Sequence, residues 1–411
     1  MTIDLTAHVR SGDGIWWGQG AAEPFPLVDA LLDQLEAIGP VRAFSGLTLN
    51  RRFRAHLPRE LALTSYGAMG ELRAVSGAGR LDVVTGHYST LPRLFAERRL
   101  PGDIGLIQVS PPGPDGLHSL GIGADYAVAA ARYSRILIAE VNRQMPVTCG
   151  TPRMSPERFA AVVRTDRPLP AVPHRDPDPV DQAIAAHVAS LVDDGDTLQL
   201  GVGTLPMAIT DALAGHADLG IHSGLIGDGV LRLVEKGVVT GNRKEIDAGV
   251  VVAGTAMGSA ALYSGIAGAP VKFYGAEYTH APDVLARLGR LVAVNAALEV
   301  DLTGQVGAEV AGDRYLGGVG GQADFSGAAA RTGARSVIAL RSTAGGASTI
   351  VAALGGPVTT ARADVDVVVT EHGVAWLRGV PLAERPARLA AIAAPDHRDR
   401  LLRFAHGARP G

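Results

Sequence analysis

Cysteine is almost absent from the chain, which has 411 residues and one cysteine, Cys149. A single thiol cannot form a disulfide within the chain, which favours a reducing compartment, and we expect Cys149 to be an ordinary small apolar residue. No run of about 18 apolar residues occurs, so no membrane span is expected. The first residues show no basic region followed by an apolar stretch, which argues against a secretory signal. We therefore expect a cytoplasmic protein.

An excess of charge is also lacking, since the formal net charge is −3. This value gives no indication of a nucleic-acid or anionic-membrane partner. The twelve histidines show no paired spacing typical of a metal site, so no metal or redox cofactor is expected. Lysine is rare, and Lys236, Lys244 and Lys272 all fall in one central segment. Genome composition is the simplest reason for this bias toward arginine.

Short apolar runs are plentiful and alternate with helical patterns over the whole length. Because most of the runs lack polar alternation, they indicate strands in sheets that are covered on both faces. The alternation predicts an α/β fold with open, mostly parallel sheets. Helices are expected at 26–39 and 205–216. The predicted strands are 80–86, 103–110, 134–142, 196–203, 248–255, 290–296, 336–343 and 365–371.

A proline-rich segment, 167–181, separates two halves of similar size. Each proline removes a backbone donor and restricts the residue before it, so regular structure is not expected there. We predict an N-terminal domain at 1–170, a linker at 171–181 and a C-terminal domain at 182–411. Each half has its own strand series, which favours two related domains that face each other across a cleft, a common place for ligands.

Three stretches carry candidate chemistry. A strand, a turn with Gly201 and Gly203, and a helix start follow one another at 196–213, and free amides at such a start can hold an anion. The glycine-rich stretch 315–329 allows a ligand to approach the backbone. Asn295, at a predicted strand end, could donate to an oxyanion. Each has an ordinary alternative, namely a tight turn, a flexible surface turn and a structural cap.

A fourth stretch, DLGIHSGLIGDGV at 218–230, is interpreted as the end of a buried strand, a loop that contains Gly224, and a helix that opens at Asp228. Ser223 lies next to Gly224. It stands in no G-x-S-x-G pattern, so a hydrolase triad is not indicated.

Together these stretches resemble the acetyl-CoA hydrolase/transferase family, which includes acetate, butyrate, 4-hydroxybutyrate and succinyl-CoA transferases. The resemblance covers nearly the whole chain. It rests on an ordered series of motifs: SGD at 11–13, EP at 23–24, QVSPPGPDGLHSLG at 108–121, AEVNRQMP at 139–146, GVGTLP at 201–206, the 218–230 stretch, VEKGVVTG at 234–241, NAALEVDLTGQV at 295–306, GGVGGQADF at 317–325, VTEHGVAWLRG at 369–379 and APDHRD at 394–399.

The resemblance implies two α/β domains with a CoA thioester between them and a glutamate that attacks the acyl-CoA covalently. The family pattern there is roughly H-T-E-x-x-x-D-G, and this chain has Gly224 where the glutamate belongs. A second departure is Thr349, which replaces the arginine of the family's S-R-I. Near the end, Ala394 and His397 replace the usual His and Phe, which we regard as peripheral.

The binding residues implied by the resemblance are retained. Gly318, Gly320, Gly321 and Gln322 would line the CoA thioester, Asn295 would help to form the oxyanion hole, and Gly201 and Gly203 would form part of the cleft wall. From its charge alone, Lys244 is a candidate for contact with a CoA phosphate. Acyl-CoA is thus the expected substrate, with a carboxylic acid or other acceptor. The default oligomer is a homodimer.

Three hypotheses follow from the missing glutamate. In the first, water or an acceptor attacks the acyl carbonyl directly, giving thioester hydrolysis, direct acyl transfer or hydrolytic C–C cleavage of an acyl-CoA; Ser223 is the nearest substitute nucleophile. In the second, ordinary CoA transfer uses another carboxylate. In the third, the protein binds acyl-CoA without catalysis. The candidate carboxylates of the second hypothesis are Glu140, Glu277, Glu299 and Glu371.

Overall fold

The computed structural model describes residues 3–54, 57–172 and 175–405. It divides into two compact units. The first consists of Met1–Pro173, Val252–Ala281 and Tyr315–Gly320, and the second of His174–Val251, Pro282–Arg314 and Gly321–Gly411. The division expected from the sequence, 1–170 and 182–411, stays a prediction.

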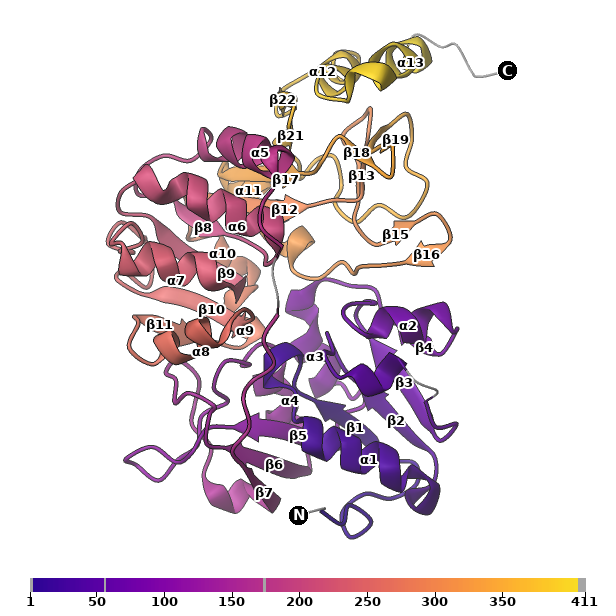
Figure 1. Ribbon diagram of the computed structural model, residues 1–411, viewed down its shortest axis with the longest axis vertical. Helices are drawn as coiled ribbons and strands as arrows, with labels where there is room; N and C mark the ends of the chain where they lie inside the picture. The colour runs from indigo at the N-terminus through magenta and orange to yellow at the C-terminus, as the bar shows by residue number, and fades with distance from the viewer. Residues whose placement is uncertain (1–2, 55–56, 173–174, 406–411) are drawn as a thin grey trace. The chain divides into compact units, whose positions relative to one another are not determined.

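The first unit is built on a seven-stranded sheet in which all neighbouring strands are parallel. Figure 1 shows these strands in indigo to purple. In spatial order they are β4 (Leu81–Val83), β3 (Leu61–Ser65), β2 (Val41–Phe44), β1 (Gly14–Trp17), β5 (Ile104–Val109), β6 (Ile136–Asn142) and β7 (Phe159–Thr165).

Helices cover both faces of this sheet, because successive strand residues point in opposite directions. Ile15 and Trp17 belong to one buried core, and Trp16, between them, belongs to the other. The helices of the main segment are α1 (Phe25–Ile38), α2 (Leu72–Gly77), α3 (Leu91–Ala96) and α4 (Ala127–Tyr133). The segment Val252–Ala281 carries most of β10 (Val251–Ala256), with α8 (Ala260–Ile266), β11 (Val271–Phe273) and α9 (Ala276–Thr279).

The second unit contributes six adjacent strands of a mostly parallel sheet. They are β9 (Gly220–Ile226), β8 (Thr197–Gln199), β12 (Leu291–Ala296), β17 (Arg335–Ala339), β21 (Val367–Thr370) and β22 (Gly373–Trp376). The pair β21–β22 is antiparallel. The helices are α5 (Pro179–Ala189), α6 (Thr204–Ala212), α7 (Asp228–Glu235), α10 (Pro282–Leu285), α11 (Gln322–Thr332), α12 (Arg385–Ala391) and α13 (Pro395–Ala405).

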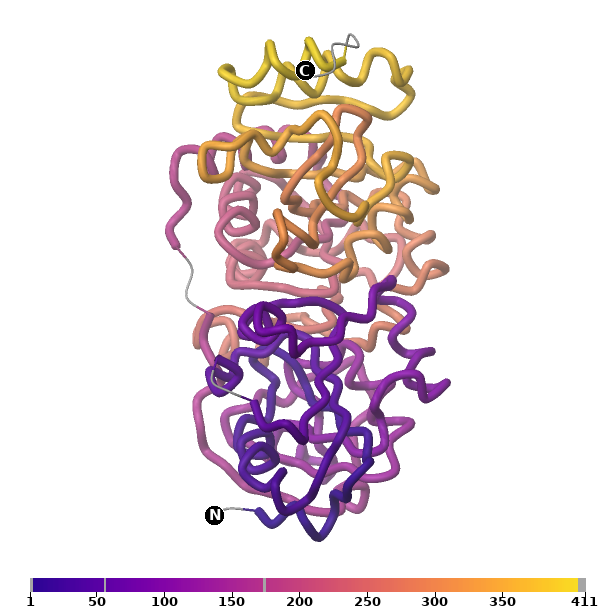
Figure 2. The backbone as a smooth tube through the Cα atoms, turned by 90° about the vertical axis from the view of Figure 1, so that its right-hand side faces the viewer, coloured from indigo at the N-terminus to yellow at the C-terminus, as the bar shows by residue number. Residues whose placement is uncertain are grey.

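Smaller elements complete the fold. Helices α12 and α13, yellow in Figures 1 and 2, pack against each other. Short strands pair in small sheets. One sheet contains β14 (Val306–Gly307), β13 (Glu299–Asp301) and β20 (Ile350–Val351). The others pair β15 (Val310–Ala311) with β16 (Arg314–Tyr315), and β18 (Thr343–Ala344) with β19 (Ala347–Ser348). The 3-10 helices are Gly20–Ala22, Arg51–Arg54, Tyr88–Thr90, Pro156–Arg158 and Leu213–Gly215.

The predicted α/β fold with mostly parallel sheets is confirmed. All eight predicted strands occur, with ends that differ by a few residues. One local interpretation was wrong, because Gly224 is not in a loop. Strand β9 continues to Ile226 and α7 then opens at Asp228, as expected. Glycine is a turn signal in sequence, but a glycine within a strand needs no special backbone conformation.

Candidate active site at the carboxyl edge of the second sheet

Three of the expected site residues of the second unit lie where three parallel strands end. Strand β8 pairs with β9, with Leu198 opposite Ile221, and with β12, with Gln199 opposite Ala293. Continuing both registers brings Gly201, Gly224 and Asn295 to the same level, just beyond the end of β8. Ligands in open parallel sheets bind at this carboxyl edge.

Gly224 is half-buried at this edge. It leaves its position without a side chain, although the strand conformation would accept any L-residue. Gly201, which follows β8, is exposed. Neither position can supply a nucleophile, a proton or a charge.

Gly203 has a different reason to be glycine. It caps α6 with a φ of 117°, a conformation that side chains disfavour, and a Cβ there would meet no atom within 4 Å. No side chain caps the helix at this residue, so the amides of its first turn stay available. Gly203 is therefore favoured by the backbone conformation of the turn and not by a lack of space for a side chain.

Asn295 forms an amide pair with Gln199, a residue that the sequence analysis missed. The Gln199 Nε2 donates to Asn295 Oδ1 over 3.3 Å. Asn295 Nδ2 and Gln199 Oε1 are both buried, and neither has a partner in the described part of the chain. If the oxygen and nitrogen positions of both side-chain amides were exchanged, one amide N–H group and one amide carbonyl would still lack a partner among the described residues. The signal in the sequence was a polar residue inside the apolar run TLQL.

The Ser223 hydroxyl is engaged by backbone. Its Oγ lies 2.8 Å from the carbonyl oxygens of Leu200 and Leu225, and the Leu200 N–H approaches the same oxygen at 3.4 Å. These contacts join the end of β8 to β9, as a structural hydroxyl does. They include no histidine or carboxylate that could act as a base, so the nucleophile role of Ser223 stays a prediction.

Lys244 is buried, with 5% of its surface exposed. Its ammonium donates to the carbonyl oxygens of Ile221 and Val250, at 2.9 and 2.7 Å. Burial lowers the pKa of Lys244 to about 8. Its stem passes over Gly220, where a Cβ would lie 2.5 Å from the lysine Cγ. This geometry gives Lys244 a structural role in the sheet, and contact with a CoA phosphate stays a prediction.

The glycine-rich stretch is divided between the two units. Gly318 and Gly320 belong to the first unit, where Gly318 bridges to Gly67 and the Gly320 carbonyl accepts from the Tyr88 N–H at 3.2 Å. Gly321 and Gln322 begin α11 in the second unit. Gln322 Nε2 is buried and has no partner among the described residues. In addition to Asn295, the second unit thus has a second buried amide donor without a partner in the described part of the chain.

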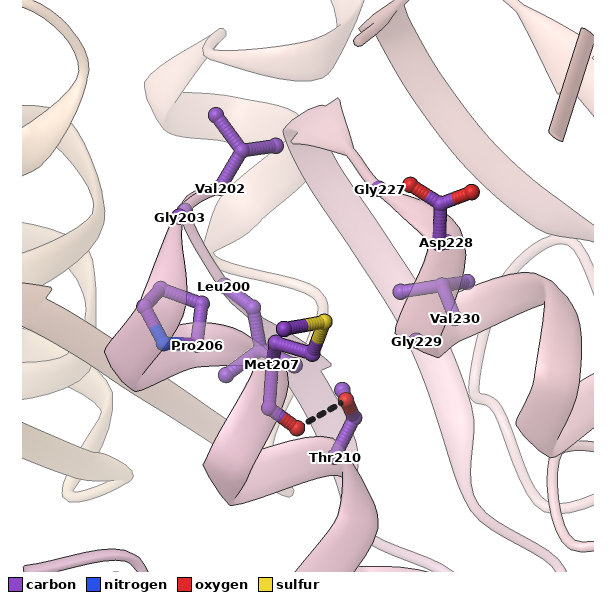
Figure 3. A pocket seen from close by; sticks show the side chains of 11 residues that line it. Leu200, Val202, Gly203, Pro206, Met207, Thr210, Gly227, Asp228, Gly229 and Val230 are labelled. Atoms are coloured by element: carbon purple, nitrogen blue, oxygen red, sulfur yellow. Dashed lines mark hydrogen bonds between the residues drawn. The ribbon is translucent and has the colours of Figure 1, made fainter. Parts of the chain in front are cut away.

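A small cavity of about 20 Å³ lies between the starts of α6 and α7 (Figure 3). Val202, Pro206, Met207 and Val230 give it mostly apolar walls. The volume suits one water molecule and is far too small for an acyl-CoA. Within residues 3–54, 57–172 and 175–405, no group of three or more His, Cys, Asp or Glu side chains could hold a metal ion. None of the helices in these residues has both the length and the apolar composition that a membrane span requires.

Comparison with known proteins identifies the family. Residues 2–156 match the acetyl-CoA hydrolase/transferase N-terminal domain, and residues 258–405 match the C-terminal domain of the same family. The chain belongs to the acetyl-CoA hydrolase/transferase family. It is 37% identical over 408 residues to a 4-hydroxybutyrate coenzyme A transferase of Clostridium kluyveri, covering 96% of this chain and 94% of that protein.

Solved structures of similar proteins have the same fold. RipA from Yersinia pestis is 33% identical with a TM-score of 0.90, and a 4-hydroxybutyrate CoA-transferase from Porphyromonas gingivalis is 33% identical with a TM-score of 0.81. Each alignment covers 98% of this chain and 95% of the other. As a member of the acetyl-CoA hydrolase/transferase family, this chain is an enzyme of the transferase or hydrolase type that acts on acyl-CoA.

Proposed function

We propose that the enzyme holds an acyl-CoA thioester beside Asn295 and lets water or another acceptor attack the acyl carbonyl directly, without a covalent carboxylate intermediate. The observation that carries the proposal is Gly224, in strand β9, level with Gly201 and Asn295 by the register of β8. With water as the acceptor, the C–S bond breaks, the oxygen joins the acyl carbon, and the products are a carboxylic acid and free CoA.

The free amide donor of Asn295 supports this proposal. Its Nδ2 is buried and has no partner in the described part of the chain, so it can stabilise the negative charge that develops on the carbonyl oxygen without first breaking another hydrogen bond there. Sites that lose a nucleophile but keep such donors still accelerate reactions by about 10³–10⁴ over water.

Recruitment of another carboxylate is less favoured, because each candidate already has a partner. Glu140 is buried and holds Arg167 through two hydrogen bonds of 2.7 and 2.8 Å. Glu371 accepts from the N–H and the hydroxyl of Ser342. Glu277 lies 3.6 Å from Arg132, and Glu299 accepts from the Gly355 N–H at 3.2 Å.

The other parts of the proposal follow the sequence analysis. The partners are an acyl-CoA and a carboxylic acid or other acceptor, in the cytoplasm, with the homodimer as the default assembly. CoA enters as part of the substrate, and the reaction as written requires no metal or redox cofactor.

The test is a panel of acyl-CoAs incubated with the enzyme, with and without acetate. Free CoA that appears without acetate supports hydrolysis, and exchange that requires acetate would contradict the proposal. A shortened acyl-CoA without free CoA, formed from a 3-oxoacyl-CoA, would instead identify C–C cleavage, in which water adds to the 3-oxo carbon and the thioester bond stays intact. Binding without any turnover across the panel would favour a non-catalytic protein.

A matched pair of variants tests the position of Gly224. Gly224→Glu restores a carboxylate, and we expect acetate-dependent CoA exchange to appear. Gly224→Gln has nearly the same size but cannot form an anhydride, so it should show no exchange. A lack of acetate-dependent CoA exchange in both folded variants would contradict the assignment of Gly224 to the family's glutamate position.

A further inference from the structure

The second unit contains a groove that none of the expected site residues lines. It has a volume of about 580 Å³, within the ~300–1,000 Å³ typical of small-molecule sites. One wall is formed by β19, β20 and Ala352, and the other by α13. Ile350 and Leu401 in its lining also belong to a buried core, so the floor of the groove is a fixed part of the fold.

Helix α13 presents one face to this groove. His397, Arg400, Leu401 and Phe404 line it at helical spacing, with Arg403 beside them. His397 Nε2 lies 3.3 Å from the carbonyl of Gly346. A carbonyl can only accept, so the imidazole donates, and this bond joins α13 to the loop of the β18–β19 hairpin.

The groove combines an apolar surface with two arginines that have no partner among the described residues. Arg400 and Arg403 make no ion pair or hydrogen bond with any residue that the structure describes. Asp396 and Asp399 precede them by four residues, yet neither forms an ion pair with its arginine. Phe404 has 39% of its surface exposed, which leaves its ring open for stacking. A ligand that matches has an aromatic or apolar body and more than one negative charge.

The position of the groove relates it to the active site of the same unit. Strand β17 pairs in parallel with β12, with Asn295 opposite Ile338. The chain leaves β17 at Ala339 and reaches the β18–β19 hairpin within a few residues, so this wall lies at the same carboxyl edge as Asn295. Strand β20 also pairs with β13, which follows Asn295 closely in sequence.

We infer that this groove binds the nucleotide end of CoA, adenosine 3′,5′-bisphosphate, with the adenine against Phe404 and the phosphates at Arg400 and Arg403. This inference rests on the proposed function in taking acyl-CoA as the substrate. Planar guanidinium groups suit phosphate oxygens, and bases stack on exposed aromatic rings.

The experiment measures binding of adenosine 3′,5′-bisphosphate to the full chain by calorimetry, which needs no turnover. We expect saturable binding, weakened about tenfold by Arg400→Ala or by Arg403→Ala, since one charge-assisted contact is lost in each. Ala347→Trp, an exposed residue on the opposite wall, should abolish binding by filling the groove without changing its charge. The matched control is Arg331→Ala, an exposed arginine at the end of α11, which should bind as the wild type does.

Wild-type affinity in Arg400→Ala, Arg403→Ala and Ala347→Trp would overturn the inference, as would no binding by the wild type. Decanoate that binds in place of the nucleotide and responds to the same variants would also overturn it, and would identify a site for apolar carboxylates. The calorimetric test of the groove does not depend on whether the enzyme cleaves a thioester, so the proposed function and this inference can fail separately. If turnover is present, acyl-CoA should show a raised KM in Arg400→Ala, whereas an acyl-pantetheine, which lacks the nucleotide, should react equally with both proteins.

Discussion

Two buried amide clusters, one in each unit, are arranged in opposite ways. In the first unit, the Gln19 amide nitrogen donates to Tyr88 and Asp125, both at 2.9 Å, and its oxygen accepts from the Tyr66 hydroxyl and the Leu47 N–H. In the second unit, Gln199 and Asn295 share one bond, and one donor and one acceptor of the pair have no partner among the residues that the structure describes.

The difference separates a structural cluster from a candidate functional one. Buried polar atoms are nearly always paired, so an unpaired group at the carboxyl edge of a parallel sheet indicates a place for a ligand. The Gln19 cluster supports its surroundings, including Tyr88, whose N–H holds the Gly320 carbonyl. Asn295, level with Gly224 by the register of β8, has an amide donor without a partner in the described part of the chain, as a ligand site requires.

The strongest test of this contrast is Asn295→Ala. We expect kcat/KM for an acyl-CoA to fall about 10²–10³-fold, as when an oxyanion donor is removed. The substitution also removes Oδ1, the acceptor for Gln199 Nε2, so the free energy of unfolding should fall by about 1 kcal/mol. Asn295→Asp keeps the shape and removes the donor, so it should lose a similar factor. An unchanged rate in both variants would mean that Asn295 is structural.

For Gln19→Leu, we expect the main effect on the free energy of unfolding and not on catalysis. It removes the bonds that Gln19 makes with the Asp125 carboxylate, the Tyr66 hydroxyl and the Leu47 N–H, which should lower the free energy of unfolding by about 3 kcal/mol. Urea unfolding followed by the fluorescence of Trp16 and Trp17, with Trp376 replaced by Phe, reports on the first unit. Gln144→Leu, at an exposed glutamine, is the control. Equal stability of the two variants would remove the contrast between the clusters.

A pH dependence in the first unit sharpens the comparison further. Burial raises the pKa of Glu23 to about 8, against the opposing effect of hydrogen bonds from Thr48 and Leu49. The folded state therefore holds this proton more tightly than the unfolded state. Stability is greatest below about pH 4.5 with respect to this group and falls as the pH rises toward 8. Urea midpoints between pH 5 and 8 should fall for the wild type and be flatter for Glu23→Gln; parallel slopes would contradict this.

The smallest effect is expected for Lys244→Met. The two carbonyls that accept from the ammonium lose a partner, so the free energy of unfolding should fall by about 1 kcal/mol. The KM for acyl-CoA should stay at its wild-type value if Lys244 is structural. A large rise in KM, absent with an acyl-pantetheine, would show instead that Lys244 binds a CoA phosphate.

The sequence alone predicted the fold class and eight strands that occur, but it did not predict β1, β2, β3 and β7 of the first sheet. Buried strands such as β5 and β6 are continuous apolar runs, and α7 opens at Asp228 as expected. Gly224 was placed in a loop because a glycine looks the same in a strand and in a turn until its backbone angles are known. The prediction that Gly224 occupies the family's glutamate position rests only on the order of the surrounding motifs.

The remaining features depend on contacts between distant residues. Gln199 gains meaning from Asn295, which lies 96 positions later. The groove requires α13 to pack beside β20, about 50 residues away in sequence, and its arginines look ordinary in a run such as DHRDRLLRF. Local patterns report which residues are buried, but they do not report which buried amide will lack a partner.

The central claim is that no carboxylate of this enzyme becomes covalently joined to the substrate. Its most direct test is the intact mass of the wild-type protein after brief incubation with an acyl-CoA that it turns over, with Gly224→Glu as the positive control. The account predicts an unmodified mass for the wild type and a CoA adduct on the variant. A CoA adduct on a glutamate or aspartate of the wild type would contradict it.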